Sequence, residues 1–144
     1  MHKKRIVFLM FISLVLFLGC TKPEDRIRGQ WQVSKVLKNN VIITNESPSE
    51  VENYLSSWTF YQSKIVIIKY QINATIYETS GKWSIDKKND ILTVSFSDRY
   101  YDIAREYTIE KFKSNELQVS FVDENQVKWK IVFALLYSLQ DYEM

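Results

Sequence analysis

The sequence predicts an all-β domain that closes into an up-and-down antiparallel barrel of about eight strands. Apolar and polar residues alternate over most of the chain from Gly29 onward, which is typical of antiparallel strands with one buried face. Clusters of turn residues separate the alternating runs at short, similar intervals, as consecutive hairpins require. Consecutive strands with one apolar face remove their free edges by closing on themselves. A two-sheet β-sandwich is the alternative.

The first element, residues 1–19, has the pattern of a secretory signal peptide. A basic segment ends at Arg5, and residues 6–18 are apolar apart from Ser13. Such a stretch is about 20 Å long as a helix, short of the ~30 Å hydrocarbon core of a bilayer. A basic start, a short apolar run and small residues at its end predict export and cleavage. An uncleaved membrane anchor is the alternative.

Cys20, the only cysteine in the chain, follows this segment directly. Residues 17–20, Phe-Leu-Gly-Cys, resemble the lipobox of bacterial lipoproteins, although Phe17 stands where leucine is usual. The resemblance implies cleavage before Cys20, a diacylglycerol on its sulfur and an acylated amino terminus. Two or more acyl chains give a stable membrane anchor that one chain cannot. We therefore expect a lipid-anchored protein at a bacterial membrane, with the outer membrane or the cell surface as its location.

Removal of the signal peptide changes the charge of the chain. It takes away three of the 19 Lys and Arg residues and none of the 17 Asp and Glu residues, so the net charge falls from +2 to −1. This charge balance disfavours nucleic acid and anionic lipid surfaces as partners. With a single cysteine, the domain also forms no internal disulfide.

Residues 20–28 are polar, contain Pro23, and are expected to form a tether between the lipid and a barrel domain at 29–144.

Ser47, Pro48 and Glu50 form a capping box with a proline at the first helical position, which predicts a short helix over 48–56 after the first strand. The predicted strands are 29–37, 58–62, 64–70, 73–79, 81–85 with 90–97, 104–112, 116–122 and 127–133. Whether 73–79 and 81–85 form one bent strand around Gly81 is left open.

The alternation also predicts which side chains point inward. In the first strand Trp31, Val33 and Leu37 share a face, but Lys35 and Val36 break the pattern. Residues 64–70 are apolar on both faces, so this strand is expected to lie deepest. Seven large residues lie on the predicted inward faces, so we expect side chains to fill the barrel interior: Trp31, Trp83, Phe96, Tyr107, Phe121, Trp129 and Phe133.

Several of these strand signatures resemble a known family. Gly29-Gln30-Trp31 is similar to the G-x-W signature of lipocalins. The order of GxW, short helix, WTFY, GKWSID, ILTVSF and YTIEKFKSNELQVSF resembles the lipocalin-like domains of small lipoproteins of the Bacteroidetes, over residues 27 to about 133. The resemblance implies that Trp31 closes one end of the barrel. An arginine from the last strand packs on this tryptophan in lipocalins; Lys128 and Lys130 stand there instead.

The chain offers little catalytic chemistry. Its only histidine, His2, lies in the expected signal peptide, which excludes histidine-dependent nucleophilic catalysis and histidine-bound zinc from the mature domain. Two aspartate pairs remain, Asp98 with Asp102 and Asp86 with Asp90, and both lie in expected turns where aspartate is common for backbone reasons. We expect no enzyme activity, metal or cofactor.

Aromatic residues are the remaining candidates for a binding site. Trp31, Tyr100, Tyr101 and Tyr107 are the candidate ligand-binding residues, because tyrosines at a barrel mouth stack on planar ligands. The alternative is that these rings cover the core. Two functions follow: a packed barrel that acts as an accessory or interaction module for an envelope partner, or a barrel that holds a small apolar or amphipathic ligand.

Overall fold

The computed structural model describes residues 22–44, 56–96 and 106–140. The expected signal peptide, Cys20 and nearly all of the predicted helix at 48–56 lie outside these residues; Ser56, at the predicted end of that helix, begins a strand instead. Within the described part of the chain no helix has the length and apolar character needed to cross a bilayer.

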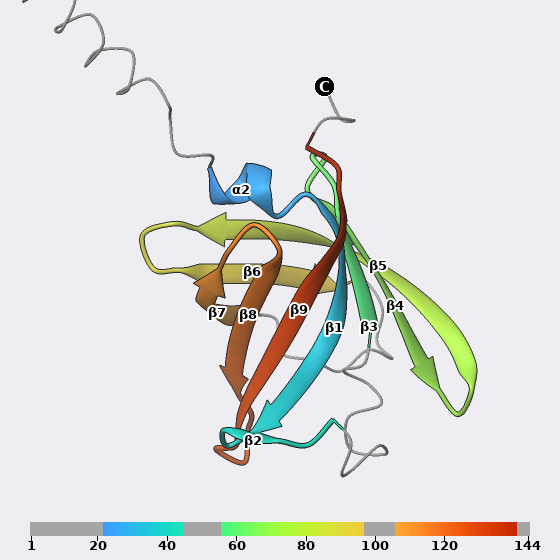
Figure 1. Cartoon of the computed structure of the whole chain (residues 1–144), viewed down its shortest axis with the longest axis vertical. Helices are drawn as coiled ribbons and strands as arrows, with labels where there is room; N and C mark the ends of the chain where they lie inside the picture. The colour runs from blue at the N-terminus through green and yellow to red at the C-terminus, as the bar shows by residue number, and fades with distance from the viewer. Residues whose placement is uncertain (1–21, 45–55, 97–105, 141–144) are drawn as a thin grey trace, which may run out of the picture.

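The predicted barrel is confirmed. Figure 1 shows one short helix followed by strands that run antiparallel to their neighbours. Eight of the described strands form the barrel, and β2 adds to the end of β1. The elements are α2 (Pro23–Arg26), β1 (Gly29–Lys38), β2 (Val41–Ile42), β3 (Ser56–Phe60), β4 (Ile65–Ile72), β5 (Thr75–Asp86), β6 (Ile91–Phe96), β7 (Glu106–Phe112), β8 (Glu116–Val122) and β9 (Lys128–Ser138).

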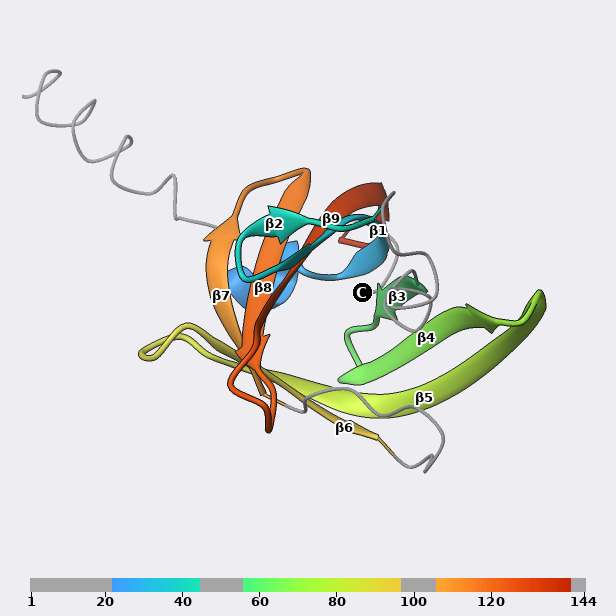
Figure 2. The same cartoon turned by 90° about the horizontal axis from the view of Figure 1, so that it is seen from below.

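The first and last strands close the barrel. β9 pairs with β1 along nearly the whole length of both strands, from Gly29 opposite Ser138 to Lys38 opposite Trp129. The ring of strands is visible from the end in Figure 2. Because every barrel strand has two hydrogen-bonded neighbours, the architecture is one closed sheet and not the two-sheet alternative.

A register shift in β1 explains the break in its sequence pattern. The pairing with β9 shifts between Val33 and Lys35, which is the signature of a β-bulge. After the shift Val36 is fully buried and Leu37 only partly buried. The prediction that Leu37 points inward with Trp31 is therefore wrong, because the extra residue moves Val36 into the barrel in its place.

The hairpin of β4 and β5 also differs from its prediction. β5 is one continuous strand through Gly81, where a Cβ would collide with the carbonyl oxygen of Ser95 on β6. In β4, Ile68 is fully buried, whereas Ile65 is 42% exposed. β4 thus has one buried face and is not the deepest strand, since Ile65 and Ile67 point outward between the buried residues Val66 and Ile68. The far part of the β4–β5 hairpin extends away from the barrel in Figures 1 and 2.

Part of the expected tether is folded. Residues 23–26 form helix α2, and Ile27 after it is fully buried in the core. The helix lies against β5 at one end of the barrel. We call this the α2 end; it also carries the β3–β4, β5–β6 and β7–β8 turns, whereas β2 and the β8–β9 turn lie at the far end.

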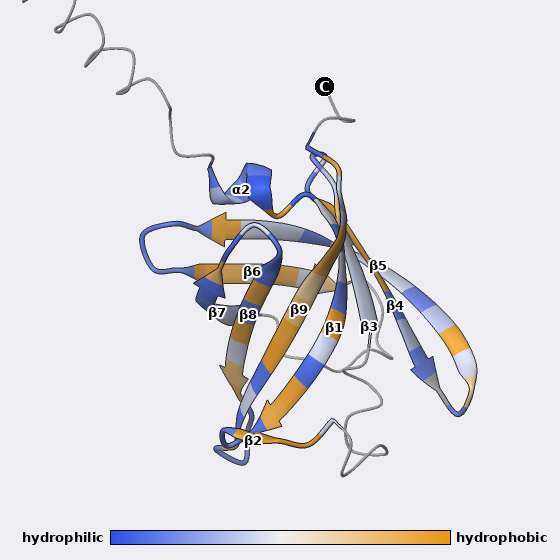
Figure 3. Cartoon of the chain, viewed as in Figure 1, coloured by the Kyte–Doolittle hydropathy of each residue, from blue (hydrophilic) through white to orange (hydrophobic). Residues whose placement is uncertain are grey.

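The apolar faces of the strands meet in one core. Figure 3 shows hydrophobic and hydrophilic residues alternating along the barrel strands. Trp83, Phe121 and Trp129, on three separate strands, belong to one continuous cluster of buried residues, as the sequence predicts. Of the seven large residues predicted to point inward, Phe96 alone is only partly buried, and it packs against the same cluster.

Candidate functional site

The barrel interior is occupied by a connected set of aromatic rings centred on Trp58. Its ring centroid lies 5.2 Å from Phe133, 5.6 Å from Tyr107 and 6.1 Å from Phe60. The set continues from Phe60 to Trp83 at 5.7 Å and from Tyr107 to Phe121 at 5.7 Å. Most of these pairs are edge-to-face, which aromatic rings favour in a close-packed core. We call these six residues the aromatic chain.

The structure describes two of the four predicted ligand-binding residues. Trp31 and Tyr107 are both fully buried, and both lie beside Trp58: Trp31 is opposite it in the β1–β3 pairing, and Tyr107 is in ring contact with it. Tyr100 and Tyr101 lie outside the described residues. The two described candidates are therefore brought together as parts of the packed interior.

Trp31 closes the α2 end of the barrel. Its indole nitrogen donates a hydrogen bond of 2.7 Å to the carbonyl oxygen of Ile27, and its ring meets Phe112 edge-on at 6.1 Å. The guanidinium of Arg26 lies 4.5 Å above the same Phe112 ring, a cation–π distance. An arginine thus completes this closure through Phe112, and it comes from helix α2.

Lys128 and Lys130, the residues considered for that role, lie elsewhere. Both ammonium groups contact Glu110 at 2.7 Å, and Ser120 donates a hydrogen bond of 2.8 Å to the same carboxylate. Partial burial by itself would raise the pKa of Glu110, but the hydrogen bonds from Lys128, Lys130 and Ser120 lower it to about 2. The lysines therefore hold an ionised carboxylate on β7 and do not close the barrel.

A second aromatic residue is fixed at the α2 end. The indole nitrogen of Trp83 donates to the carbonyl oxygen of Tyr61 at 3.1 Å, and the ammonium of Lys64 lies 4.2 Å above the Trp83 ring. Lys64 also donates to a carboxylate oxygen of Glu24 on α2 at 3.1 Å. This hydrogen bond lowers the pKa of Glu24. Helix α2 is thereby linked to the turn between β3 and β4.

A groove of about 460 Å³ lies across β6, β7 and β8. Ile91, Thr108 and Ser120 are cross-strand neighbours that line it. Because their chain neighbours Leu92 and Val119 are fully buried, this row of residues points to the outer face of the barrel. Tyr107 and Phe121 of the aromatic chain also line the groove, so it opens on the outer wall of the barrel and borders the rings of its interior.

At the far end, one aspartate organises the β8–β9 turn. The carboxylate of Asp123 accepts hydrogen bonds from the indole nitrogen of Trp129 at 2.9 Å and from the backbone nitrogen atoms of Asn125 and Val127 at 2.9 and 3.0 Å. The hydrogen bond from Trp129, followed by those from the turn, lowers the pKa of Asp123. Asp123 therefore has a structural role that fixes Trp129 at this end of the core.

The aspartate pairs considered for chemistry are placed in part. Asp86 accepts hydrogen bonds from the backbone and side chain of Asn89 and from the backbone of Lys88, and the side-chain hydrogen bond from Asn89 is the main cause of its lowered pKa. Asp98 and Asp102 lie outside the described residues. Within the described ranges no group of three or more His, Cys, Asp or Glu side chains could hold a metal ion.

Sequence reasoning missed three residues that organise the interior and its closure. Trp58 starts the predicted WTFY strand, and its spacing of two from Phe60 could have marked it as inward-facing. Phe112 lies at the end of a strand, where a bulge after Ile109 changes the alternation. Arg26 had no sequence signal beyond the nearby Pro23, because a helix of four residues is too short to show a period.

The comparisons with known proteins support the fold. No family model matches the chain, and no curated protein does. Among solved structures, a DUF4847 family protein from Bacteroides vulgatus has a TM-score of 0.51 at 16% identity, covering 75% of this chain and 92% of that one. Japanin from Rhipicephalus appendiculatus, bound to cholesterol, has a TM-score of 0.53 at 11% identity, covering 81% and 80%. The chain thus has a lipocalin-like β-barrel fold.

Proposed function

We propose that this chain is a lipid-anchored bacterial envelope protein whose barrel is a non-catalytic interaction module. The observation that carries the proposal is the aromatic chain centred on Trp58, which joins five barrel strands across the interior. An eight-stranded barrel is just wide enough for side chains or for one small ligand. Rings in mutual contact in that space leave the outer surface as the part available for recognition.

The outer surface offers apolar contacts away from the core. Val41 and Ile42, the two residues of β2, are 58% and 48% exposed at the far end of the barrel. Exposed apolar side chains that form a contiguous patch mark sites that meet other proteins or membranes, and these two are neighbours in the chain. An envelope protein partner that packs on β2 is the kind of interaction that this surface supports.

Membrane attachment is supported by the sequence around Cys20. The single cysteine directly follows an apolar segment with a basic start, and two or more acyl chains on it would supply the anchoring energy. The absence of histidine after His2 supports a role that does not depend on catalysis.

Cys20→Ala should release the protein from the membrane fraction, because the acyl chains provide the anchoring energy. Metabolic labelling with a palmitate analogue should mark the wild-type protein and leave the variant unlabelled. Ser34→Ala, at an exposed position on β1, is the control and should be labelled and sediment like the wild type. A variant that still sediments with membranes, beside an unlabelled wild type, would mean that the amino-terminal segment is an uncleaved membrane helix.

The second candidate function is a carrier for a small apolar or amphipathic ligand. It is favoured by the cholesterol bound to japanin, which shares the fold at 11% identity. To hold a ligand inside the barrel, this chain would have to separate the rings of Trp58 and Tyr107 from their neighbours, since both residues are buried against other rings. Saturable binding of cholesterol by the native barrel would favour the carrier over the interaction module.

A further inference from the structure

Helix α2 is fixed to the barrel and does not behave as a free linker. Glu24 accepts a hydrogen bond from Lys64, and Arg26 stacks on Phe112. Ile27, the next residue, is fully buried, and the backbone of Arg28 accepts a hydrogen bond from Leu139 at 3.2 Å. The orientation of the barrel is therefore coupled to the position of Pro23, where the helix begins.

Only residues 21 and 22 separate Cys20 from Pro23. An extended chain advances at most about 3.3–3.6 Å per residue, so Cys20 lies within about 11 Å of the start of α2. Strand β1 has 10 residues, which corresponds to about 33 Å at roughly 3.3 Å per residue. Acyl chains on Cys20 would consequently lie much closer to the α2 end than to the far end.

The charges of the α2 end fit a phospholipid surface. The acidic residues of the helix have basic partners: Glu24 pairs with Lys64 at 3.1 Å, and Asp25 with Arg28 at 3.5 Å. Other lysines of this end form no ion pair with the residues that the structure describes: Lys22, Lys87, Lys88 and Lys113. Asp86 and Asp90 lie in the same turn as Lys87 and Lys88 and offset their charge, which leaves Lys22 and Lys113 as the basic residues that face headgroups. Basic side chains next to a membrane anchor are attracted to anionic headgroups.

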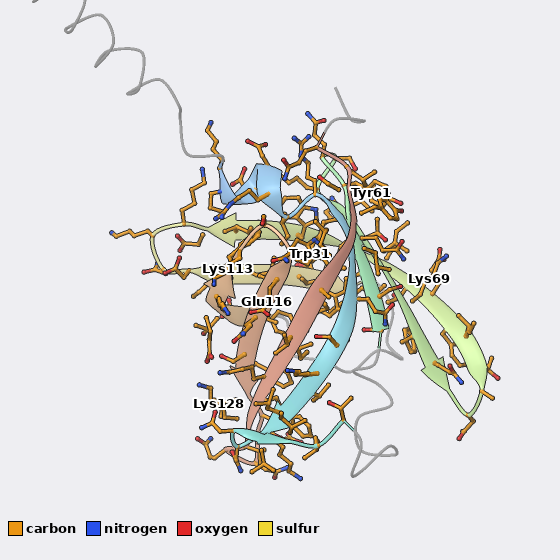
Figure 4. All side chains as sticks on the ribbon, in the orientation of Figure 1. Trp31, Tyr61, Lys69, Lys113, Glu116 and Lys128 are labelled. Atoms are coloured by element: carbon orange, nitrogen blue, oxygen red, sulfur yellow. The ribbon has the colours of Figure 1, made fainter. Side chains whose placement is uncertain are left out.

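We infer that the α2 end of the barrel rests on the membrane surface that holds the anchor, and that the far end with β2 points away from it. Figure 4 shows the two ends, with Lys113 towards α2 and Lys128 near β2. The inference rests on the proposed lipidation of Cys20. The net charge of −1 disfavoured an anionic lipid surface as a partner, because a net charge does not show that basic residues gather at one end of the barrel.

The experiment compares two turn positions at opposite ends of the barrel. Lys88 and Asn125 are exposed, and the backbone nitrogen of each donates a 2.9 Å hydrogen bond to the aspartate two residues earlier. Lys88→Cys and Asn125→Cys are therefore matched variants. Each full-length, acylated protein is labelled with a thiol-reactive fluorophore in vesicles of phosphatidylethanolamine and phosphatidylglycerol. The vesicles contain lipids with a nitroxide on the headgroup as the quencher.

We expect several-fold stronger quenching at position 88 than at position 125. Equal quenching of the two labels in acylated, vesicle-bound protein would overturn the orientation and leave the proposed anchoring intact. Protein that is neither acylated nor bound to vesicles would overturn both.

A longer tether tests the cause of the orientation. Insertion of twelve Gly and Ser residues between Lys22 and Pro23 adds a flexible chain with a typical span of about 17–21 Å. This insertion should reduce quenching at position 88 at least two-fold. Unchanged quenching would contradict the inference that the short connection holds the α2 end at the membrane.

Discussion

Trp58→Ala is expected to destabilise the barrel by about 3–5 kcal/mol or more, because it removes the ring that connects the aromatic chain. Trp58 is 1% exposed and contacts Phe60, Tyr107 and Phe133. The loss of stability includes the free energy of transferring the indole from water to the core and the cost of the cavity that it leaves between three rings. Against a total stability of roughly 5–15 kcal/mol, this change alone could unfold the domain.

Urea unfolding of a soluble form that starts at residue 21 measures this effect. Trp58→Phe keeps a ring but removes the indole nitrogen, which donates a 2.8 Å hydrogen bond to the hydroxyl of Ser56. This variant should therefore lose less stability than Trp58→Ala. Ile76→Ala, at a side chain that is 73% exposed, is the surface control. A free energy of unfolding that is the same in Trp58→Ala and wild type would contradict a packed interior.

Trp31→Ala is expected to cost a similar ~3–5 kcal/mol and also to loosen helix α2. Trp31 is fully buried, packs edge-on against Phe112, and donates its indole hydrogen bond to Ile27. Without it, the backbone after α2 loses its attachment to the core, and Arg26 loses the packing that holds the Phe112 ring in place.

Thermal unfolding and hydrogen exchange together measure the two effects of Trp31→Ala. We expect a lower melting temperature and faster exchange of the backbone amides of Arg26 and Ile27, which donate hydrogen bonds within the helix and at its end. Gln32→Ala is the matched control, since Gln32 is half-buried and its side chain makes one hydrogen bond of 3.3 Å to the Ser56 carbonyl oxygen. A melting temperature unaffected by the loss of Trp31 would show that this ring does not close the barrel.

The barrel could be predicted because apolar and polar residues alternate over most of its strands. In β8, for example, Leu117 and Val119 are buried while Gln118 between them is only partly buried, so the period of two is legible without a structure. The bulge in β1 could not be predicted, because its position depends on how β1 meets β9 when the sheet closes. That single extra residue reversed the expected roles of Val36 and Leu37.

The closure of the α2 end shows a different limit of sequence reasoning. The role of Trp31 could be predicted from its place in the first strand, whereas its partners could not. Arg26 and Phe112 are far apart in the sequence and meet through the three-dimensional arrangement of α2 and β7. Trp58 could have been identified from its spacing of two from Phe60, with the polar Thr59 between them, but its central place among the rings depends on how β3, β7 and β9 meet inside the barrel.

The most direct test of the packed interior is a ligand titration that uses the protein's own tryptophans. All four tryptophans of the chain belong to the buried core, so a ligand that enters the barrel must come close to them. The native soluble form, starting at residue 21, is titrated with cholesterol and with a long-chain fatty acid while tryptophan fluorescence is recorded. A close-packed core leaves few voids larger than a water molecule, and we therefore predict no saturable change. Stoichiometric, saturable quenching by either compound would contradict the packed barrel and identify the chain as a ligand carrier.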